Sequence, residues 1–270
     1  MLGSNINKIF CDLTDYSSVK KAIKELKPNI VVHLAALSSV SYSYMHPIEV
    51  LETNILGSVN LIEACASETE SLDKFIFAST SETYGNHIDS DFPLVEESTQ
   101  DPNSPYSVSK KTIEEYLRYM YLASDFPAVI MRPFNTYGRK NDSNFVIERT
   151  ITQMLKSDKV YLGDPEAIRD FMYVDDHISA YLKIIDMNSV MGETFNVCTG
   201  TSYSIRETAE KIKEITQFKG EINWNSIPRR PYDIIKLQGS NRKIHELTGW
   251  TPRYSLDQGI AKTIEMWRKK

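Results

Sequence analysis

The chain has 270 residues, of which 41% are hydrophobic and 25% charged, a composition typical of a globular protein with one large domain and a small one. The net charge is −5 and the basic residues are scattered among acidic ones, which argues against nucleic-acid binding and favours a small-molecule ligand. The sequence has no apolar run of the ~18 residues that a membrane span needs and no signal-peptide pattern, so we expect a cytoplasmic protein without membrane contact. Cys11, Cys65 and Cys198 lie in apolar stretches and predict reduced core thiols, with no metal site.

Strands and helices alternate through the first half of the chain. A short strand is predicted over residues 7–11, followed by a helix that Asp15 caps and Pro28 stops. Residues 30–34 are almost all apolar and β-branched, as expected of a parallel strand buried on both faces. Further elements are predicted over residues 47–67 (helix), 74–78 (strand), 106–122 (helix) and 128–132 (strand). This alternation predicts an α/β fold with a doubly wound parallel sheet.

After Pro133 the predicted elements become shorter and more mixed. Helices are expected over residues 144–156, 175–185, 204–216 and 255–269, and strands over residues 160–162, 171–173, 194–197 and 221–224. We therefore predict a Rossmann-like dinucleotide-binding domain over residues 1–140. Residues 141–270 are expected to form a smaller α/β lobe that caps the substrate, with residues 165–200 partly returning to the sheet.

The carboxyl ends of the predicted strands indicate where a ligand binds. In an open parallel sheet the ligand lies beyond these ends. The segments that follow the strands are residues 35–37, 79–82 and 133–137, so we expect all three to face one crevice. The helix that begins near Tyr106 is expected to flank it.

Tyr106 and Lys110 stand four residues apart at the start of a predicted helix, directly after Pro105. A tyrosine has a free pKa of about 10, so one that acts as a base near neutral pH needs a cation to stabilise its phenolate. Positions four apart share one face of a helix, which brings the ammonium of Lys110 to the phenol. The spacing indicates a proton-transfer site; the alternative is an ordinary amphipathic helix.

Eight short motifs follow one another in order along almost the whole chain. They are DLTD (12–15), HLAA (33–36), N-x-x-G (54–57), STSETYG (79–85), SPYSVSK (104–110), RPFNTYG (132–138), RDF (169–171) and GWTP (249–252). Together they resemble the extended short-chain dehydrogenase/reductases, in the branch of NAD-dependent nucleotide-sugar epimerases and 4,6-dehydratases, with the GDP-mannose and UDP-sugar dehydratases most similar. The resemblance implies an enzyme that binds NAD, with NADP not distinguished, and a nucleotide-diphosphate hexose.

One part of the family pattern is missing. The family opens with a Gly-x-x-Gly-x-x-Gly turn, and the helix after it binds the dinucleotide pyrophosphate. This sequence has only Gly3 in that region and lacks the first βαβ unit, so the Rossmann-like sheet is expected to be N-terminally incomplete. We expect a truncated or mis-started sequence; a monodisperse chain that binds NAD tightly would contradict this expectation.

The resemblance assigns catalytic roles to Thr80, Glu82, Tyr106 and Lys110. NAD removes hydride from C4 of the hexose while Tyr106 accepts the hydroxyl proton, Lys110 lowers the pKa of Tyr106, and Thr80 orients the hydroxyl. The residue type at position 82 distinguishes the possible reactions. A 4,6-dehydratase needs a second base for the C5 proton, whereas a 4-epimerase does not and usually carries a small residue there. UDP-glucuronate decarboxylases also share this glutamate.

The resemblance also carries over the binding residues. The expected cofactor-binding residues are Asp12, Leu13, Leu34, Ala35, Ala36, Asn54, Ser79, Tyr106, Lys110 and Pro133. The expected substrate-binding residues are Ser38, Thr80, Ser81, Asn135, Asn144, Arg169 and Arg230. Family members pair through two helices each, so a homodimer through residues 47–67 and 106–122 is expected.

Three readings of function stay open from the sequence. A nucleotide-sugar 4,6-dehydratase is favoured by Glu82, and a UDP-glucose-type 4-epimerase is the alternative on the same scaffold. A non-catalytic protein that still binds a sugar nucleotide is the third, but it does not explain why Thr80, Tyr106 and Lys110 are all present. The nucleotide base, whether guanine, uracil or thymine, is not determined by these residues.

Overall fold

The computed structural model describes residues 6–69, 71–139 and 142–269. Contacts within the chain divide it into two compact units that interleave along the sequence. The first unit comprises Met1–Ala78, Ser104–Ile130 and Met191–Glu193, and the second comprises Ser79–Asn103, Met131–Val190 and Thr194–Lys270. Each unit is described by itself. The predicted assignment of one part to the cofactor and the other to the substrate stays a prediction.

Strands β1 (Ile30–His33) and β2 (Lys74–Ala78) of the first unit belong to a parallel sheet. The two strands pair in parallel, with Ile30 opposite Lys74 and His33 opposite Phe77. The hydrogen-bonded order of the sheet is β1-β2-β3-β8, where β3 is Ala128–Pro133 and β8 is Thr194–Val197. The predicted α/β fold with a parallel sheet is therefore confirmed.

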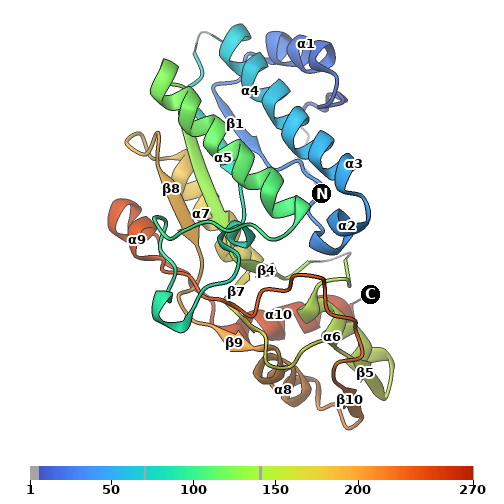
Figure 1. The fold of residues 1–270 in the computed structure, drawn as a ribbon. Helices are drawn as coiled ribbons and strands as arrows, with labels where there is room; N and C mark the ends of the chain where they lie inside the picture. The colour runs from blue at the N-terminus through green and yellow to red at the C-terminus, as the bar shows by residue number, and fades with distance from the viewer. Residues whose placement is uncertain (1–5, 70, 140–141, 270) are drawn as a thin grey trace. The chain divides into compact units, whose positions relative to one another are not determined.

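The helices of the first unit cover this sheet. Helix α1 (Tyr16–Leu26) begins where the Asp15 side chain accepts a hydrogen bond from the Ser17 amide, as its sequence predicts. It packs against α4 (Gly57–Glu68), and Figure 1 shows the two side by side. Helix α5 (Pro105–Ser124) completes the core. The buried residues of this core are Val19, Ile23, Ile62, Ala64, Cys65, Phe75, Phe77, Ile113, Leu117, Met120, Phe126, Ala128 and Ile130.

The helix predicted over residues 47–67 forms with an unexpected turn inside it. It runs as α3 (Pro47–Leu51), a π-helical segment η1 (Glu52–Leu56) and α4. A π turn inside an α-helix often marks a functional position. A Cβ on Gly57, the first residue of α4, would lie 3.0 Å from the Leu13 Cβ, so glycine lets the two segments approach closely. A short helix α2 (Val40–Met45) precedes α3 and was not predicted.

Two expectations for the N-terminal region are wrong. Residues 7–11 form no strand, because no strand in the described part of the chain pairs with them. Their side chains stay unburied, and Phe10 is 95% exposed. Cys11 is also exposed and therefore not a core thiol, whereas Cys65 and Cys198 are buried as expected.

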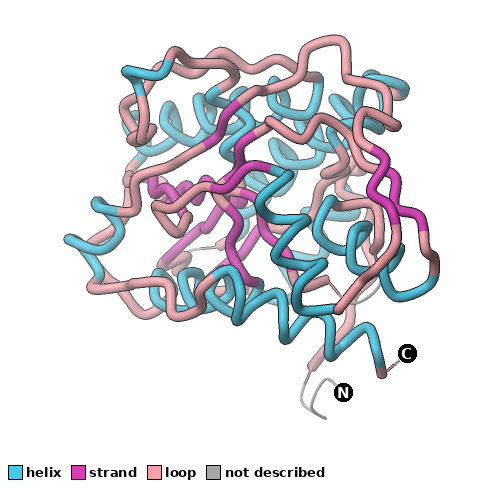
Figure 2. Tube along the Cα trace, turned by 90° about the horizontal axis from the view of Figure 1, so that it is seen from below, coloured by secondary structure: helices cyan, strands magenta, loops and turns pink. Residues whose placement is uncertain are grey.

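The second unit is built from short strands and longer helices (Figure 2). Strand β4 (Asn135–Tyr137) pairs in parallel with β7 (Phe171–Tyr173), and β5 (Lys159–Tyr161) with β10 (Glu221–Asn223). In a third sheet, β6 (Ile168–Arg169) lies between β11 (Lys236–Leu237) and β9 (Tyr203–Ser204). The strands predicted near residues 160, 171, 194 and 221 are confirmed. The two-residue strands β6, β9 and β11 are too short to give a sequence pattern.

The helices of the second unit surround a core of their own. They are α6 (Val146–Lys156), α7 (Val174–Ile185), α8 (Ile205–Thr216), α9 (Arg242–Thr248) and α10 (Leu256–Arg268). Ser204 and Ser255 cap α8 and α10 in reciprocal capping boxes, which explains why these helices begin where the sequence predicts. The core includes Tyr137, Ile147, Ile151, Val160, Leu162, Phe171, Ile212, Ile260 and Ile264. No helix in the described ranges is both long and apolar enough to cross a membrane.

We expect Gly85→Ala to destabilise the protein strongly. Gly85 follows the 3-10 helix η2 (Ser81–Tyr84) with φ of 70°, and a Cβ there would lie 1.9 Å from the Asp101 carbonyl oxygen. The clash and the left-handed backbone predict a loss of about 3 kcal/mol in the free energy of unfolding, measured by urea denaturation.

Gly163→Ala is the matched control, because a Cβ at Gly163 would have no atom within 4 Å. Its effect should stay below about 0.5 kcal/mol. Equal stability of the two variants would contradict the assigned geometry of the turn at Gly85.

Candidate active site

The N-terminus of α5 carries Tyr106. Ser104 and Ser107 cap the helix reciprocally, and Pro105 occupies its first position. Tyr106 is the second residue of the helix and is 8% exposed, and its carbonyl accepts a hydrogen bond of 2.7 Å from the Ser109 hydroxyl. The capping box thus sets the start of the helix and with it the place of the phenol.

Lys110 lies one turn further along α5 and is almost fully buried. Its Nζ donates a hydrogen bond of 2.8 Å to the carbonyl oxygen of Ala78, the last residue of β2, and lies 4.7 Å from the centre of the Phe77 ring. Burial lowers the pKa of Lys110 to about 8. The Lys110 ammonium is thereby fixed at the carboxyl end of β2. Because its pKa is lowered, it releases its proton more readily than a free lysine does.

His33 lies in the same layer of the first unit and is also buried. Its Nε2 is 2.8 Å from the Ser58 hydroxyl oxygen. Burial, together with the positive charge of Lys110, lowers the pKa of His33 to about 4, so the ring is neutral at physiological pH. His33 is the core histidine that its apolar strand predicts.

Asn54, in the π segment, holds the loop that follows β1. Its Oδ1 accepts a hydrogen bond from the Leu37 amide (2.8 Å), and its Nδ2 donates to the Leu37 carbonyl (3.1 Å) and to the Ser109 hydroxyl (3.1 Å). The buried amide therefore joins the post-strand loop to α5, three residues from Tyr106. These hydrogen bonds position the loop.

The loop itself exposes small and apolar side chains. Leu34 is 62% exposed, Ala35 and Ser38 are exposed, and Ala36 is half-buried. A second loop, over residues 12–14, contacts α4. There Asp12 is exposed and its Oδ1 accepts from the Thr14 amide and hydroxyl, which lowers the pKa of Asp12, while the Leu13 carbonyl accepts a 2.8 Å bond from Asn60.

In the second unit, the segment after β2 turns sharply. Ser79, Thr80 and Ser81 are buried, and Glu82 is half-buried. The Thr80 hydroxyl accepts a bond of 3.2 Å from the Glu82 amide and caps η2. Thr80 and Glu82 are therefore fixed on one 3-10 turn, two residues apart, as a hydroxyl and a carboxylate.

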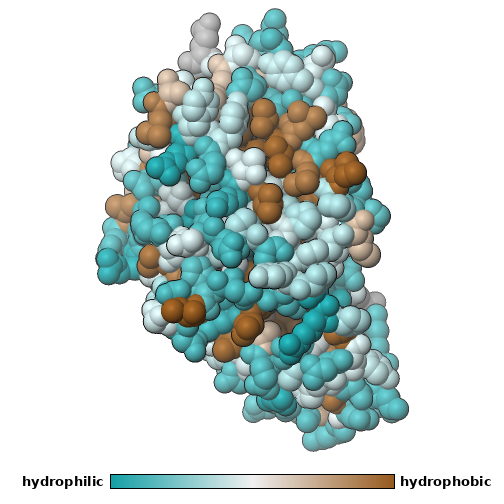
Figure 3. Space-filling view, in the orientation of Figure 1, coloured by the Kyte–Doolittle hydropathy of each residue, from teal (hydrophilic) through white to brown (hydrophobic). Residues whose placement is uncertain are grey.

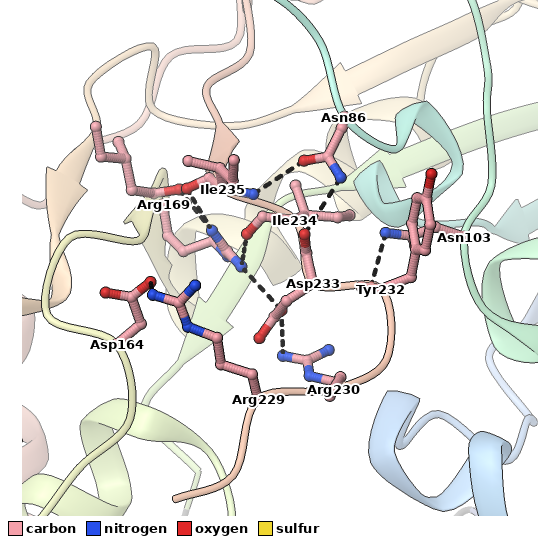
Figure 4. Close-up of polar contacts among 11 residues, drawn as sticks. Asn86, Asn103, Asp164, Arg169, Arg229, Arg230, Tyr232, Asp233, Ile234 and Ile235 are labelled. Atoms are coloured by element: carbon pink, nitrogen blue, oxygen red, sulfur yellow. Dashed lines mark hydrogen bonds and ion pairs between the residues drawn. The ribbon is translucent and has the colours of Figure 1, made fainter. Parts of the chain in front are cut away.

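Arg169, on β6, is a buried cation in this unit (Figure 4). Its guanidinium donates to the carbonyls of Ile168 (2.9 Å), Ile234 (2.7 Å) and Ile235 (3.3 Å). Burial lowers the pKa of Arg169, and the attraction of Glu82 is the largest opposing effect. The buried guanidinium of Arg169 is thus held by three backbone carbonyls, and the nearby negative charge of Glu82 partly offsets the cost of its burial.

The other predicted substrate residues are partly brought together. The guanidinium of Arg230 lies 3.6 Å from the Asp233 carboxylate, which also lies 3.9 Å from Arg169. Asn135, at the start of β4, has a buried Oδ1 without a hydrogen-bond partner among the described residues. Asn144 is exposed and precedes α6, which begins two residues after it. Pro133 ends β3.

Sequence reasoning missed Asn86, Asn103 and Asp233 as parts of this site. The two asparagines bond backbone atoms 129 to 149 residues further along the chain. A lone asparagine in a loop gives no sequence signal for such a distant partner. The pattern Arg230-Pro231-x-Asp233 was the one local clue to the acidic residue.

Tyr106 and Lys110 therefore lie one turn apart on α5, and Thr80 and Glu82 lie on one 3-10 turn. Residues 2–263 match the protein family described as GDP-mannose 4,6 dehydratase. The chain therefore belongs to this family of nucleotide-sugar dehydratases, epimerases and reductases.

Relatives in the family differ in activity. The GDP-6-deoxy-D-mannose reductase of Pseudomonas aeruginosa is 30% identical over 96% of this chain and 86% of its own length. The dTDP-D-glucose 4,6-dehydratase of Homo sapiens is 31% identical, over 96% of this chain and 74% of the relative. The crystal structure of Thermus thermophilus UDP-glucose 4-epimerase in complex with NAD is 29% identical, with a TM-score of 0.90 over 99% of this chain and 86% of that structure.

We expect Lys110→Met to stabilise the fold at neutral pH. The ammonium of Lys110 is desolvated in the folded protein, so removing it should raise the free energy of unfolding by on the order of 1–3 kcal/mol at pH 7, allowing for the lost bond to Ala78. Between pH 8 and 10.5 the unfolded lysine holds a proton that the folded one has released. The free energy of unfolding of the native chain therefore rises with pH in this window. The stability difference between the Lys110→Met variant and the native chain becomes smaller as a result.

Urea denaturation of both proteins at pH 7, 9 and 10.5 measures this difference. Lys21→Met is the matched control, because Lys21 is exposed, and its stability difference should not change with pH. A Lys110→Met protein that is less stable than the native chain at every pH would show that the ammonium is not desolvated.

Proposed function

We propose that the protein is an NAD(P)-dependent nucleotide-sugar 4,6-dehydratase. The observation that carries this proposal is Glu82, a carboxylate on the same 3-10 turn as Thr80 and attracted by the buried guanidinium of Arg169. Oxidation at C4 alone requires no such group, whereas elimination across C5 and C6 requires a base for the C5 proton. The 4,6-dehydratases among the relatives, at about 30% identity, support the same reaction.

The residues of the first unit fit a nicotinamide cofactor. Leu34 and Ala35 expose apolar surface at the carboxyl end of β1, and Lys110 presents a cation at the carboxyl end of β2. Solved structures of relatives contain NAD or NADPH, which supports this cofactor class. When bound, NAD accepts hydride from C4 of the hexose and returns it to C6.

Each proton transfer is assigned to a side chain of this protein. Tyr106 accepts the proton of the C4 hydroxyl, and Lys110 lowers the pKa of the phenol by its charge. Thr80 donates a hydrogen bond to the same oxygen and orients it. Glu82 removes the C5 proton, which the C4 ketone has made acidic, and gives that proton to the C6 hydroxyl, which leaves as water. The proton that Tyr106 took returns to C5 through solvent as hydride reaches C6, which gives a 4-keto-6-deoxy sugar and restores both side chains.

The diphosphate of the substrate is assigned to Arg230 and Asn135. Arg230 has its charge on an accessible segment, and the side-chain amide of Asn135 offers N–H donors for a phosphate, whereas its buried Oδ1, which has no partner in the described chain, is an acceptor for a hydroxyl of the ligand. Arg169 already donates to three carbonyls. We therefore propose that Arg169 supports Glu82 and the backbone, and that Arg230 binds the phosphates.

A 4-epimerase is the second candidate. The Thermus thermophilus epimerase supports it by its structural likeness over 99% of this chain. The same tyrosine, lysine and threonine serve that reaction, because it also begins with oxidation at C4. The two candidates differ in Glu82, which has no task in epimerisation.

We also propose a cytoplasmic homodimer. Figure 3 shows apolar side chains gathered on the surface where α3 and α4 lie. Exposed apolar residues of the first unit include Ile48 on α3, Leu56 on η1, and Tyr119 and Leu122 on α5. Such a surface on paired helices is suited to contact with a second copy.

We expect Glu82→Gln to separate oxidation from elimination. The amide cannot take the C5 proton, so formation of the 4-keto-6-deoxy product should fall by about 10²- to 10⁴-fold, while NADH absorbance still rises on addition of the nucleotide sugar. Product is followed by mass spectrometry with GDP-, UDP- and dTDP-hexoses.

Glu97→Gln is the matched control, since Glu97 is exposed at the surface of the same unit, and it should keep the native rate. If the Glu82 variant forms product at the native rate, Glu82 is not the base and the dehydratase assignment loses its support.

A further inference from the structure

Residues 229–235, here called the strap, form an exposed segment without a β-ladder in the second unit. They precede the two-residue strand β11 and carry Arg229 and Arg230. Most side chains along the strap are open to solvent, with Tyr232 64% and Ile235 72% exposed, whereas the Ile234 side chain is buried in the core beside Tyr84 and Leu237. A segment with so little regular structure needs other contacts to keep one conformation.

Two asparagines fasten the strap, as Figure 4 shows. Asn86 donates from Nδ2 to the Asp233 carbonyl (3.2 Å) and accepts at Oδ1 from the Ile235 amide (3.0 Å). Asn103 donates to the Tyr232 carbonyl (3.1 Å). The amide of Asn86 thus takes the place of a neighbouring strand, pairing one donor and one acceptor of the strap.

The strap is also held from β6. The Arg169 guanidinium donates to the carbonyls of Ile234 and Ile235. Side chains from three segments that are distant in sequence therefore bind consecutive backbone groups of the strap. The fastening leaves Arg230 beside Asp233, and it links the strap through Asn86 to the turn that bears Glu82.

We propose that Asn86 and Asn103 are positioning residues that hold the strap so that Arg230 meets the diphosphate of the nucleotide sugar. This inference rests on the proposed function, because it names Arg230 as the phosphate ligand. Neither asparagine touches the reacting atoms. Their effect is to keep the strap closed, and each bond lost should shift the equilibrium between the closed and the open strap about fivefold toward the open form.

Limited trypsin digestion of the full chain without ligand tests the fastening. Trypsin cleaves after Arg229 but not between Arg230 and Pro231, so one peptide bond reports opening of the strap. Cleavage follows the open population. We expect loss of the bond to Tyr232 in Asn103→Ala to speed this cut about fivefold, and loss of the bonds to Asp233 and Ile235 in Asn86→Ala to speed it about 25-fold. Asn29→Ala, which removes a similar bond from Asn29 to the Ser71 carbonyl in the first unit, should leave it unchanged.

Calorimetric binding of GDP, UDP and dTDP to the same proteins tests the consequence. The nucleotide that the native chain binds should bind the Asn86 and Asn103 variants more weakly, with NAD affinity unchanged. Unaltered cleavage in both variants, or faster cleavage without weaker nucleotide binding, would overturn the proposal. If the native chain binds none of the three nucleotides, the proposed function is wrong, and so is the proposed phosphate contact of Arg230. The digestion experiment still decides in that case whether the two asparagines hold the strap.

Discussion

The bond from the Lys110 ammonium to the Ala78 carbonyl is the interaction on which the proposed chemistry depends. It fixes a buried cation at the carboxyl end of β2, one residue before the segment that contains Thr80 and Glu82. Desolvation lowers the pKa of Lys110 to about 8 and makes the charge costly to the fold. A costly buried charge of this kind is typical of a group kept for function. The capping box at Ser104 and the Asn54 network position the same helix around it.

Most of the regular structure could be predicted because the signals are local. The run of β-branched residues in β1, the Asp15 cap of α1 and the capping box at Ser204 each lie within a few residues of the element they specify. The strand expected over residues 7–11 shows the limit of such signals. Its sequence suits a strand, but strand formation also requires a partner, which a local pattern does not reveal.

The residues of the candidate site also divide into those with a local sequence signal and those held by long-range contacts. The spacing of Tyr106 and Lys110 predicts that they share a helix, and both lie on α5, whereas the role of Glu82 comes from the family resemblance and stays a prediction. The π turn at Asn54, the use of Arg169 as a backbone support and the pairing of Asn86 with the strap are long-range contacts without a sequence pattern. Arg169 illustrates the consequence: its sequence suggested a phosphate ligand, whereas its donors are directed to carbonyls in the structure.

The central claim is that Glu82 makes this site a dehydratase. Turnover of a nucleotide hexose with NAD in D₂O, followed by NMR and mass spectrometry, tests it most directly. The account predicts a 4-keto-6-deoxy product that has lost water, carries solvent deuterium at C5 and has the former C4 hydrogen at C6. A C4 epimer of unchanged mass with no deuterium on carbon would contradict it.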